Sequence, residues 1–115
     1  MTTRDDLLID LINRTEMNGE GPRITVVTEG VVITGRLSPH RRWATDLAER
    51  LGDAGAPDDR FAEDFAREAG ETPEYPPAFL HLRGCQLISG TSSLPAALGE
   101  SFRVPLSAVS AWSVR

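Results

Sequence analysis

Apolar side chains near the start of the chain recur with the period of an α-helix. The recurring positions are Leu7, Leu8, Leu11 and Ile12. Positions four residues apart share one face of a helix, so these side chains form a single apolar stripe. Thr3 is placed to cap this helix, with Asp5 and Asp6 in its first turn, where the helix dipole favours negative charge. The run Asn-Gly-Glu-Gly-Pro at 18–22 ends the predicted helix.

Two runs rich in β-branched residues follow, joined by a two-residue link. Residues 23–28 read Arg-Ile-Thr-Val-Val-Thr and residues 31–37 read Val-Val-Ile-Thr-Gly-Arg-Leu, with Glu29 and Gly30 between them. β-branched side chains favour strands, and a short link that contains glycine is typical of a tight hairpin. The pattern predicts an antiparallel β-hairpin.

A second amphipathic helix is predicted after the hairpin. Ser38 and Pro39 are typical of a helix start, because a serine hydroxyl can cap the first turn and proline suits the first helical position. The apolar stripe of this helix, with one residue every four, consists of Trp43, Leu47 and Leu51. Gly52 is the expected end of the helix.

Almost all of the net charge lies in one internal segment. The chain carries 17 acidic residues against 12 basic ones, all arginines, for a net charge of −5. Residues 53–75 hold eight acids and two arginines, which gives this segment −6 and the rest of the chain +1. A short helix is predicted within it over 59–69, with Phe61 and Phe65 four residues apart and Gly70 as its stop. Such charge blocks commonly stay solvated, so a role in solubility and a role as an electrostatic contact for partners both stay open.

Extended segments make up the last third of the chain. Strands are predicted over 78–83, 85–88, 101–104 and 109–114, with a loop at 89–99 and a tight turn at 105–108. Gly84 marks a bulge inside the first of these extended segments. Together with the hairpin, they supply antiparallel neighbours for one small sheet.

The order of elements predicts an α+β fold. We expect a small antiparallel five-stranded barrel of the Sm-like or SH3-like kind, preceded by an N-terminal helix. Residues 38–77 would form a helical, acidic insertion between the second and third strands. A length of 115 residues suits a single domain over 1–115.

Composition also bears on the compartment. No apolar run exceeds three residues, far short of the about 20 that a membrane-spanning helix needs. Cys85 is the only cysteine, so no intrachain disulfide is possible, which fits a reducing compartment. Asp5 and Asp6 stand where a signal peptide has a basic region. A soluble, cytoplasmic protein is expected.

Catalytic motifs are not found in the sequence. The glycines between 84 and 92 have the wrong spacing for a phosphate-binding loop, and the chain has no lysine to complete one. Gly19 and Gly21 lack the third glycine of a dinucleotide-binding motif and precede a strand, not a helix. His81 and Cys85 lie four residues apart, but a metal would need a further ligand. We predict no catalytic residue, no cofactor and no metal, with His81 half-buried on a strand and Cys85 inert in the core.

One short stretch raises the question of nucleic-acid binding. Residues 40–43, His-Arg-Arg-Trp, place two arginines beside an aromatic ring. Phosphate binding needs clustered positive charge, whereas this chain is acidic and has no lysine. Nucleic acid is therefore not the expected partner, and Trp43 is interpreted as a core residue. An oligomeric Sm-like or SH3-like module that binds a peptide or RNA is kept as the alternative function.

Three stretches of the chain occur in the order found in one known family. Residues 24–38, Ile-Thr-Val-Val-Thr-Glu-Gly-Val-Val-Ile-Thr-Gly-Arg-Leu-Ser, lead into a helix with an aromatic residue. Residues 79–83 read Phe-Leu-His-Leu-Arg, and residues 102–112 read Phe-Arg-Val-Pro-Leu-Ser-Ala-Val-Ser-Ala-Trp. In this collinear order, and with an acidic insertion between the second and third strands, the chain resembles the gas vesicle accessory protein U family over residues 23–115.

The resemblance implies a non-catalytic accessory protein that is linked to the clustering or assembly of gas vesicles and does not build their shell. It implies a location in the cytoplasm at the vesicles, with shell proteins or other accessory proteins as partners and no membrane. Homo-oligomers are left open.

The charge distribution suggests how association would work: the acidic insertion of one copy would pair with arginines of a neighbour. The candidate interaction residues are Arg36, Arg41, Arg42, Asp58, Asp59, Glu63 and Asp64.

Overall fold

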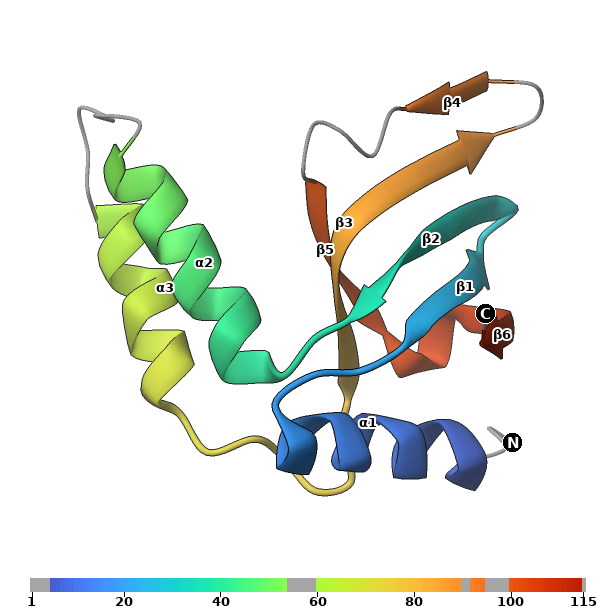
Figure 1. Cartoon of the computed structure of the whole chain (residues 1–115), viewed down its shortest axis with the longest axis horizontal. Coiled ribbons are helices and arrows are strands. Elements are labelled where there is room, and N and C mark those ends of the chain that lie inside the picture. Colours follow the sequence, from blue (N-terminus) through green and yellow to red (C-terminus); the bar gives the residue numbers. More distant parts are fainter. Residues whose placement is uncertain (1–4, 54–59, 90–91, 95–99, 115) are drawn as a thin grey trace.

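The computed structural model describes residues 5–53, 60–89, 92–94 and 100–114, and it confirms an α+β fold with antiparallel strand pairing (Figure 1). The helices are α1 (Asp6–Asn18), α2 (His40–Asp53) and α3 (Arg60–Gly70). The strands are β1 (Arg23–Thr28), β2 (Val31–Leu37), β3 (Phe79–Ser89), β4 (Ser92–Leu94), β5 (Glu100–Pro105) and β6 (Val109–Val114), with a 3₁₀ turn, η2 (Leu106–Ala108), before β6.

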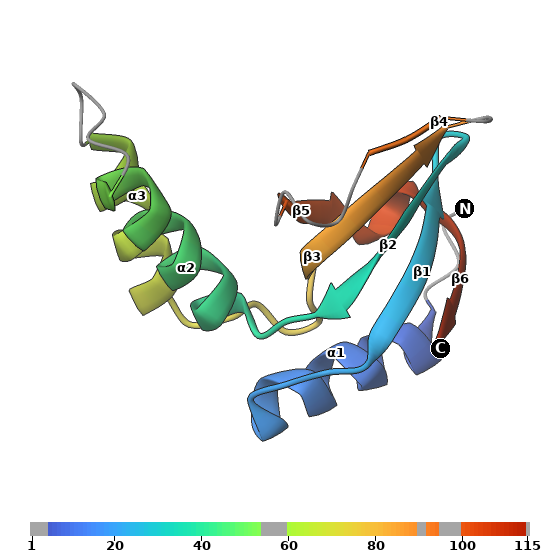
Figure 2. The same cartoon turned by 45° about the horizontal axis from the view of Figure 1, so that its top comes forward.

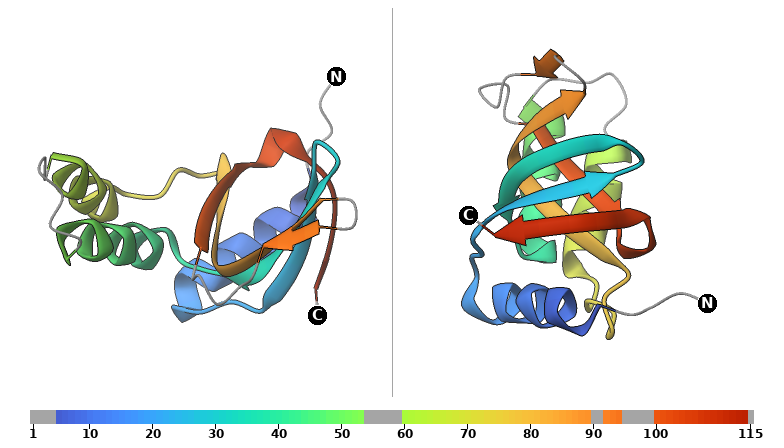
Figure 3. Two further views of the ribbon diagram at one scale, coloured as in Figure 1. Left: turned by 90° about the horizontal axis from the view of Figure 1, so that it is seen from above. Right: turned by 90° about the vertical axis from the view of Figure 1, so that its right-hand side faces the viewer.

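The sheet is curved but not closed, so the predicted five-stranded Sm-like or SH3-like barrel is not confirmed. The strands follow the order β4-β3-β2-β1-β6, and β5 pairs with the first half of β3. Although η2 joins β5 directly to β6, the two strands pair with different neighbours, β3 and β1, at the two sides of the curved sheet (Figure 3). A short sixth strand, β4, also lies where the sequence predicted only a loop.

The predicted hairpin is confirmed, residue for residue. β1 and β2 pair from Arg23↔Arg36 to Thr28↔Val31. The two residues between them, Glu29 and Gly30, have φ values of 50° and 80°. Positive φ at both central positions is the geometry of a type I′ turn, whose twist matches that of the flanking strands.

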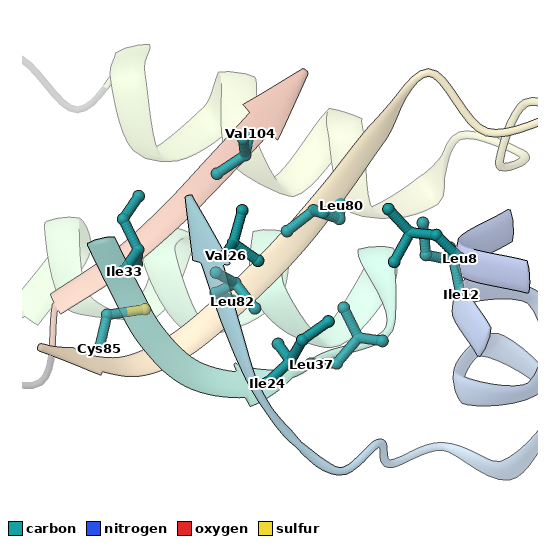
Figure 4. Close-up of a cluster of buried hydrophobic side chains, with 10 residues drawn as sticks. All are labelled: Leu8, Ile12, Ile24, Val26, Ile33, Leu37, Leu80, Leu82, Cys85 and Val104. Carbon is teal, nitrogen blue, oxygen red and sulfur yellow. The ribbon is translucent and has the colours of Figure 1, made fainter. Parts of the chain in front are cut away.

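The first helix lies across one end of the curved sheet and supplies part of the core (Figures 3 and 4). Leu8 and Ile12 of the predicted stripe are buried, and Leu11 packs against the same cluster. Leu7 was wrongly placed in the stripe, because its side chain is 68 % exposed. The N-cap is Asp5, whose carboxylate accepts a hydrogen bond from the Leu8 amide at 3.1 Å. The predicted cap, Thr3, lies outside the described residues.

Ten buried side chains form the main core between the strands and α1 (Figure 4). They are Leu8, Ile12, Ile24, Val26, Ile33, Leu37, Leu80, Leu82, Cys85 and Val104. In β1 and β2 the buried residues alternate with more exposed ones, as strands with one face on the core require. Cys85 is 1 % exposed, and burial raises its pKa to about 11, so the sulfur is a neutral core thiol.

The start of α2 differs from the prediction. The Ser38 hydroxyl donates to the Pro39 carbonyl at 3.2 Å and does not cap the helix, which begins at His40. The amide of His40 instead donates to the Glu16 carboxylate of α1 at 2.6 Å. A side chain 24 positions earlier therefore occupies the place that a local cap would take.

Helices α2 and α3 form a hairpin that projects from the sheet (Figure 2). A small apolar cluster holds the two helices together: Trp43, Ala44 and Ala69 are buried, and Leu47 and Phe65 pack against them. Trp43 is thus a core residue, as predicted, and the insertion is helical. No helix in the described part of the chain has the length and apolar character to cross a membrane.

Candidate functional site

A cluster of polar and aromatic side chains lies where the helical hairpin meets the sheet. We call this cluster the joint; its members are His40 and Trp43 of α2, Glu68 of α3, His81 of β3 and Arg103 of β5. The main chain contributes a hydrogen bond from the Ser38 amide to the His81 carbonyl at 2.9 Å. Four separate elements therefore converge on one small volume.

Glu68 is the electrostatic centre of the joint. Its Oε1 lies 3.0 Å from Nε2 of His40 and 3.2 Å from Nη2 of Arg103. The hydrogen bond from His40, together with the Arg103 charge, holds the pKa of Glu68 below its usual value, so the carboxylate is ionised and only accepts. Nε2 of His40 is therefore the N–H donor, which fixes the orientation of that ring.

Ring contacts complete the joint. The ring centroids of His81 and Trp43 are 4.8 Å apart, and those of His81 and His40 are 5.3 Å apart. The Arg103 guanidinium lies 4.0 Å from the centroid of the Phe79 ring and 5.9 Å from that of Trp43. Arg103 thus combines an ion pair with two aromatic contacts, for which a planar guanidinium with several donors is better suited than a compact ammonium group.

His81 is the most perturbed group in the joint. Its side chain is 6 % exposed, and Nε2 has no hydrogen-bond partner. Burial, followed by the charges of His40 and Arg103, lowers the pKa of His81 from 6.5 to about 3. The imidazole is accordingly neutral at physiological pH. The prediction of a half-buried strand histidine was right about the strand and wrong about the burial.

A cavity of about 240 Å³ opens beside the joint, between the hairpin and α1. Three further carboxylates line it, those of Glu16, Glu71 and Glu74, together with the rings of His40 and His81. No serine or cysteine is among its lining residues. Within the described ranges, no three histidine, cysteine or acidic side chains are grouped as they would need to be to hold a metal ion.

The structure places the predicted interaction residues in three different settings. Arg36 lies on β2, where it contacts Glu20 at 3.3 Å and donates to the Gly21 carbonyl at 3.1 Å. Arg41 and Arg42 are exposed in the first turn of α2.

The acidic candidates lie on the hairpin or outside the described residues. Glu63 and Asp64 are exposed on α3, and Asp64 pairs with Arg67 of the same helix at 3.3 Å. Asp58 and Asp59 fall outside the residues that the structure describes. The described partners of Arg36 are Glu20 and Gly21, and that of Asp64 is Arg67 of the same helix. Within one chain the structure therefore does not bring Arg36 and Asp64 together.

Sequence reasoning missed the joint as a unit. The sequence pattern sets His40 and His81 in separate contexts, and it gives Glu68 only as one of the eight acids of the segment 53–75. The available signal was that the chain has two histidines, one just after the second strand and one in the third. If the second and third strands are predicted to pair, His40 and His81 are expected to lie near each other.

Comparison with known proteins gives one finding. A protein-family model described as gas vesicle protein GvpU-like matches residues 5–115, which is nearly the whole chain. Neither the curated proteins nor the solved structures gave a match. The matched region includes the hairpin, the sheet and every residue of the joint. The chain therefore belongs to the gas vesicle protein GvpU-like family.

Proposed function

We propose that this protein is a non-catalytic accessory protein in the cytoplasm that promotes the clustering or assembly of gas vesicles through protein–protein contacts. The observation that carries the proposal is the projecting hairpin, with acidic side chains exposed on α3 and two exposed arginines, Arg41 and Arg42, at its base. The family match supplies the link to gas vesicles. The proposed partner is a shell protein or another accessory protein of the vesicle. A second copy of this chain is a further proposed partner.

Charge segregation suggests the kind of contact. The segment 53–75 carries −6 and the remainder +1, so neighbouring copies on a vesicle could pair acids with arginines. One exposed ion pair contributes only about 0.2–1 kcal/mol, too little to hold two molecules together. Many copies on one surface act together, and avidity can exceed a single affinity by about 10²–10⁴. A weak contact is therefore sufficient when it is repeated.

Removal of charge from the insertion tests this proposal. We expect the fourfold variant Asp58→Asn, Asp59→Asn, Glu63→Gln and Asp64→Asn to lose the clustering of vesicles while keeping its fold. Light scattering of a vesicle suspension reports clustering, and circular dichroism reports the fold. The described acids are exposed, so their neutral analogues fit without repacking.

A matched variant controls for net charge. Asp6→Asn, Asp10→Asn, Glu29→Gln and Glu100→Gln also remove four negative charges, but from α1, the β1–β2 turn and β5. Each fourfold variant changes the formal net charge from −5 to −1. Equal clustering by the wild type and both variants would contradict a role for the insertion, and equal loss in both would assign the effect to net charge.

A further inference from the structure

The helical hairpin has a hydrophobic cluster of its own. Within the described residues, the cluster built on Trp43, Ala44 and Ala69 is separate from the core between the sheet and α1. The packing of the hairpin against the sheet therefore depends on the joint and not on a shared apolar core. The chain crosses between the two parts at Ser38–Pro39 and again between α3 and β3.

His81 is the histidine that the sheet contributes to the joint, and it lies among ionisable groups of the neighbouring elements. His40 of α2, Glu68 of α3 and Arg103 of β5 act on it directly. Glu16 of α1 lines the adjoining cavity, as do Glu71 and Glu74 after α3. Electrostatic interactions with His40 and Arg103 disfavour the charged form of the His81 ring, and the opposite effect of Glu68 is smaller than either. A second cation at His81 is therefore unfavourable while the hairpin is packed on the sheet.

We propose that the joint is a proton-sensitive attachment: the hairpin stays packed on the sheet while the buried His81 imidazole is uncharged, and uptake of a proton by His81 releases the hairpin. Release would remove Trp43 and His40 from the His81 ring and separate Glu68 from Arg103. The inference concerns the attachment of the hairpin and does not depend on the proposed vesicle function.

The direction of the pH effect follows from linkage. In the packed state the pKa of His81 is about 3, because burial disfavours the charged ring, whereas a solvated imidazole has a pKa of 6.5. Below pH 6.5 the released state therefore takes up a proton that the packed state does not bind. The equilibrium constant for packing of the hairpin on the sheet therefore has its highest value above pH 6.5. It falls about tenfold for each pH unit below 6.5, until the pH nears 3. Between pH 7.5 and 5.0 this equilibrium constant is expected to fall about 30-fold.

Glu68 acts in the same direction but at lower pH. Its pKa is held below 4.5 by the hydrogen bond from His40. The Glu68 carboxylate therefore stabilises the packed hairpin fully above pH 4.5, and this stabilisation is lost as the pH falls further. Measurements that stop at pH 5.0 therefore report on His81 more than on Glu68.

Amide hydrogen exchange on the full-length chain measures the release. Released from the sheet, α2 and α3 keep only their own small cluster, and helices of 14 and 11 residues are marginal in isolation, so their amides exchange. We expect their opening constant, corrected for the intrinsic exchange rate, to rise about 30-fold from pH 7.5 to 5.0. Amides of β1 and β2 serve as the internal control and are expected to change much less.

His81→Phe is the variant that separates the proposal from general acid destabilisation, since phenylalanine keeps a ring against Trp43 and cannot take up a proton. Its hairpin amides should show an opening constant independent of pH between 7.5 and 5.0. A dependence equal to that of the wild type would overturn the proposal, as would a rise in exchange shared equally by hairpin and sheet.

If His81→Phe does not fold, proton NMR of the wild type decides. A His81 ring that titrates near 6.5 in the packed protein overturns the proposal, and a ring that stays neutral to pH 5 supports it. Because the chain has two histidines, His40→Gln assigns the signals.

Discussion

Replacing Leu8 by alanine is expected to lower the free energy of unfolding by about 2–5 kcal/mol. The Leu8 side chain is 2 % exposed and belongs to the main core, where α1 covers one end of the sheet. Truncation removes apolar contacts and leaves a cavity that the surrounding strands can fill only in part. Urea unfolding followed by circular dichroism measures the change.

The adjacent residue provides a matched control, since Leu7 is the same amino acid on the same helix with 68 % of its side chain exposed. We expect Leu7→Ala to change the free energy of unfolding by less than about 0.5 kcal/mol. Similar losses for the two variants would show that α1 does not pack on the sheet through Leu8.

Replacing Gly21 by alanine is expected to lower the free energy of unfolding by about 1–3 kcal/mol. A Cβ atom built on Gly21 would lie 2.5 Å from Oγ1 of Thr15 and 2.8 Å from the carbonyl oxygen of Leu37. Neither atom can easily move. Thr15 is buried and donates to the Leu11 carbonyl at 2.9 Å, while the Leu37 carbonyl accepts from the Gly21 amide at 3.1 Å. Thermal unfolding of Gly21→Ala gives the cost.

The control for this variant is Gly52→Ala in α2. No atom lies within 4 Å of a Cβ at Gly52, and alanine favours a helix more than glycine does. We therefore expect no loss of stability there. A Gly21→Ala protein as stable as the wild type would contradict the close contact between the end of α1 and the end of β2.

Local patterns predicted the elements well where a single physical preference decides them. The β1–β2 hairpin follows from β-branched runs around a two-residue link, and no distant contact is needed to specify it. The apolar stripe of α1 was partly wrong because Leu7, Leu8 and Ile9 are consecutive and cannot all face one side. Packing against the sheet decides among them, and it buries Leu8 and Ile9.

The joint could not be predicted in the same way. Its contacts connect residues far apart in the chain: Glu68 is 28 positions after His40, and Arg103 is 35 positions after Glu68. His40, Glu68 and Arg103 are polar, so a pattern of hydrophobicity does not mark them, although it does mark Trp43. The same holds for the 2.7 Å hydrogen bond from the Trp112 indole to Asp5, which spans 107 positions. Both arise from the folded arrangement of the strands.

The proposed clustering of gas vesicles through charged contacts is best tested by mixing the purified protein with purified vesicles at two salt concentrations. Centrifugation that separates vesicles from solution, followed by assay of the protein in each fraction, reports binding, and light scattering reports clustering. We expect binding and clustering at 0.1 M salt and their loss at 1 M, because the Debye length falls from about 10 Å to about 3 Å. Protein that stays in solution at 0.1 M salt, or clusters that persist unchanged at 1 M, would rule out the proposed function.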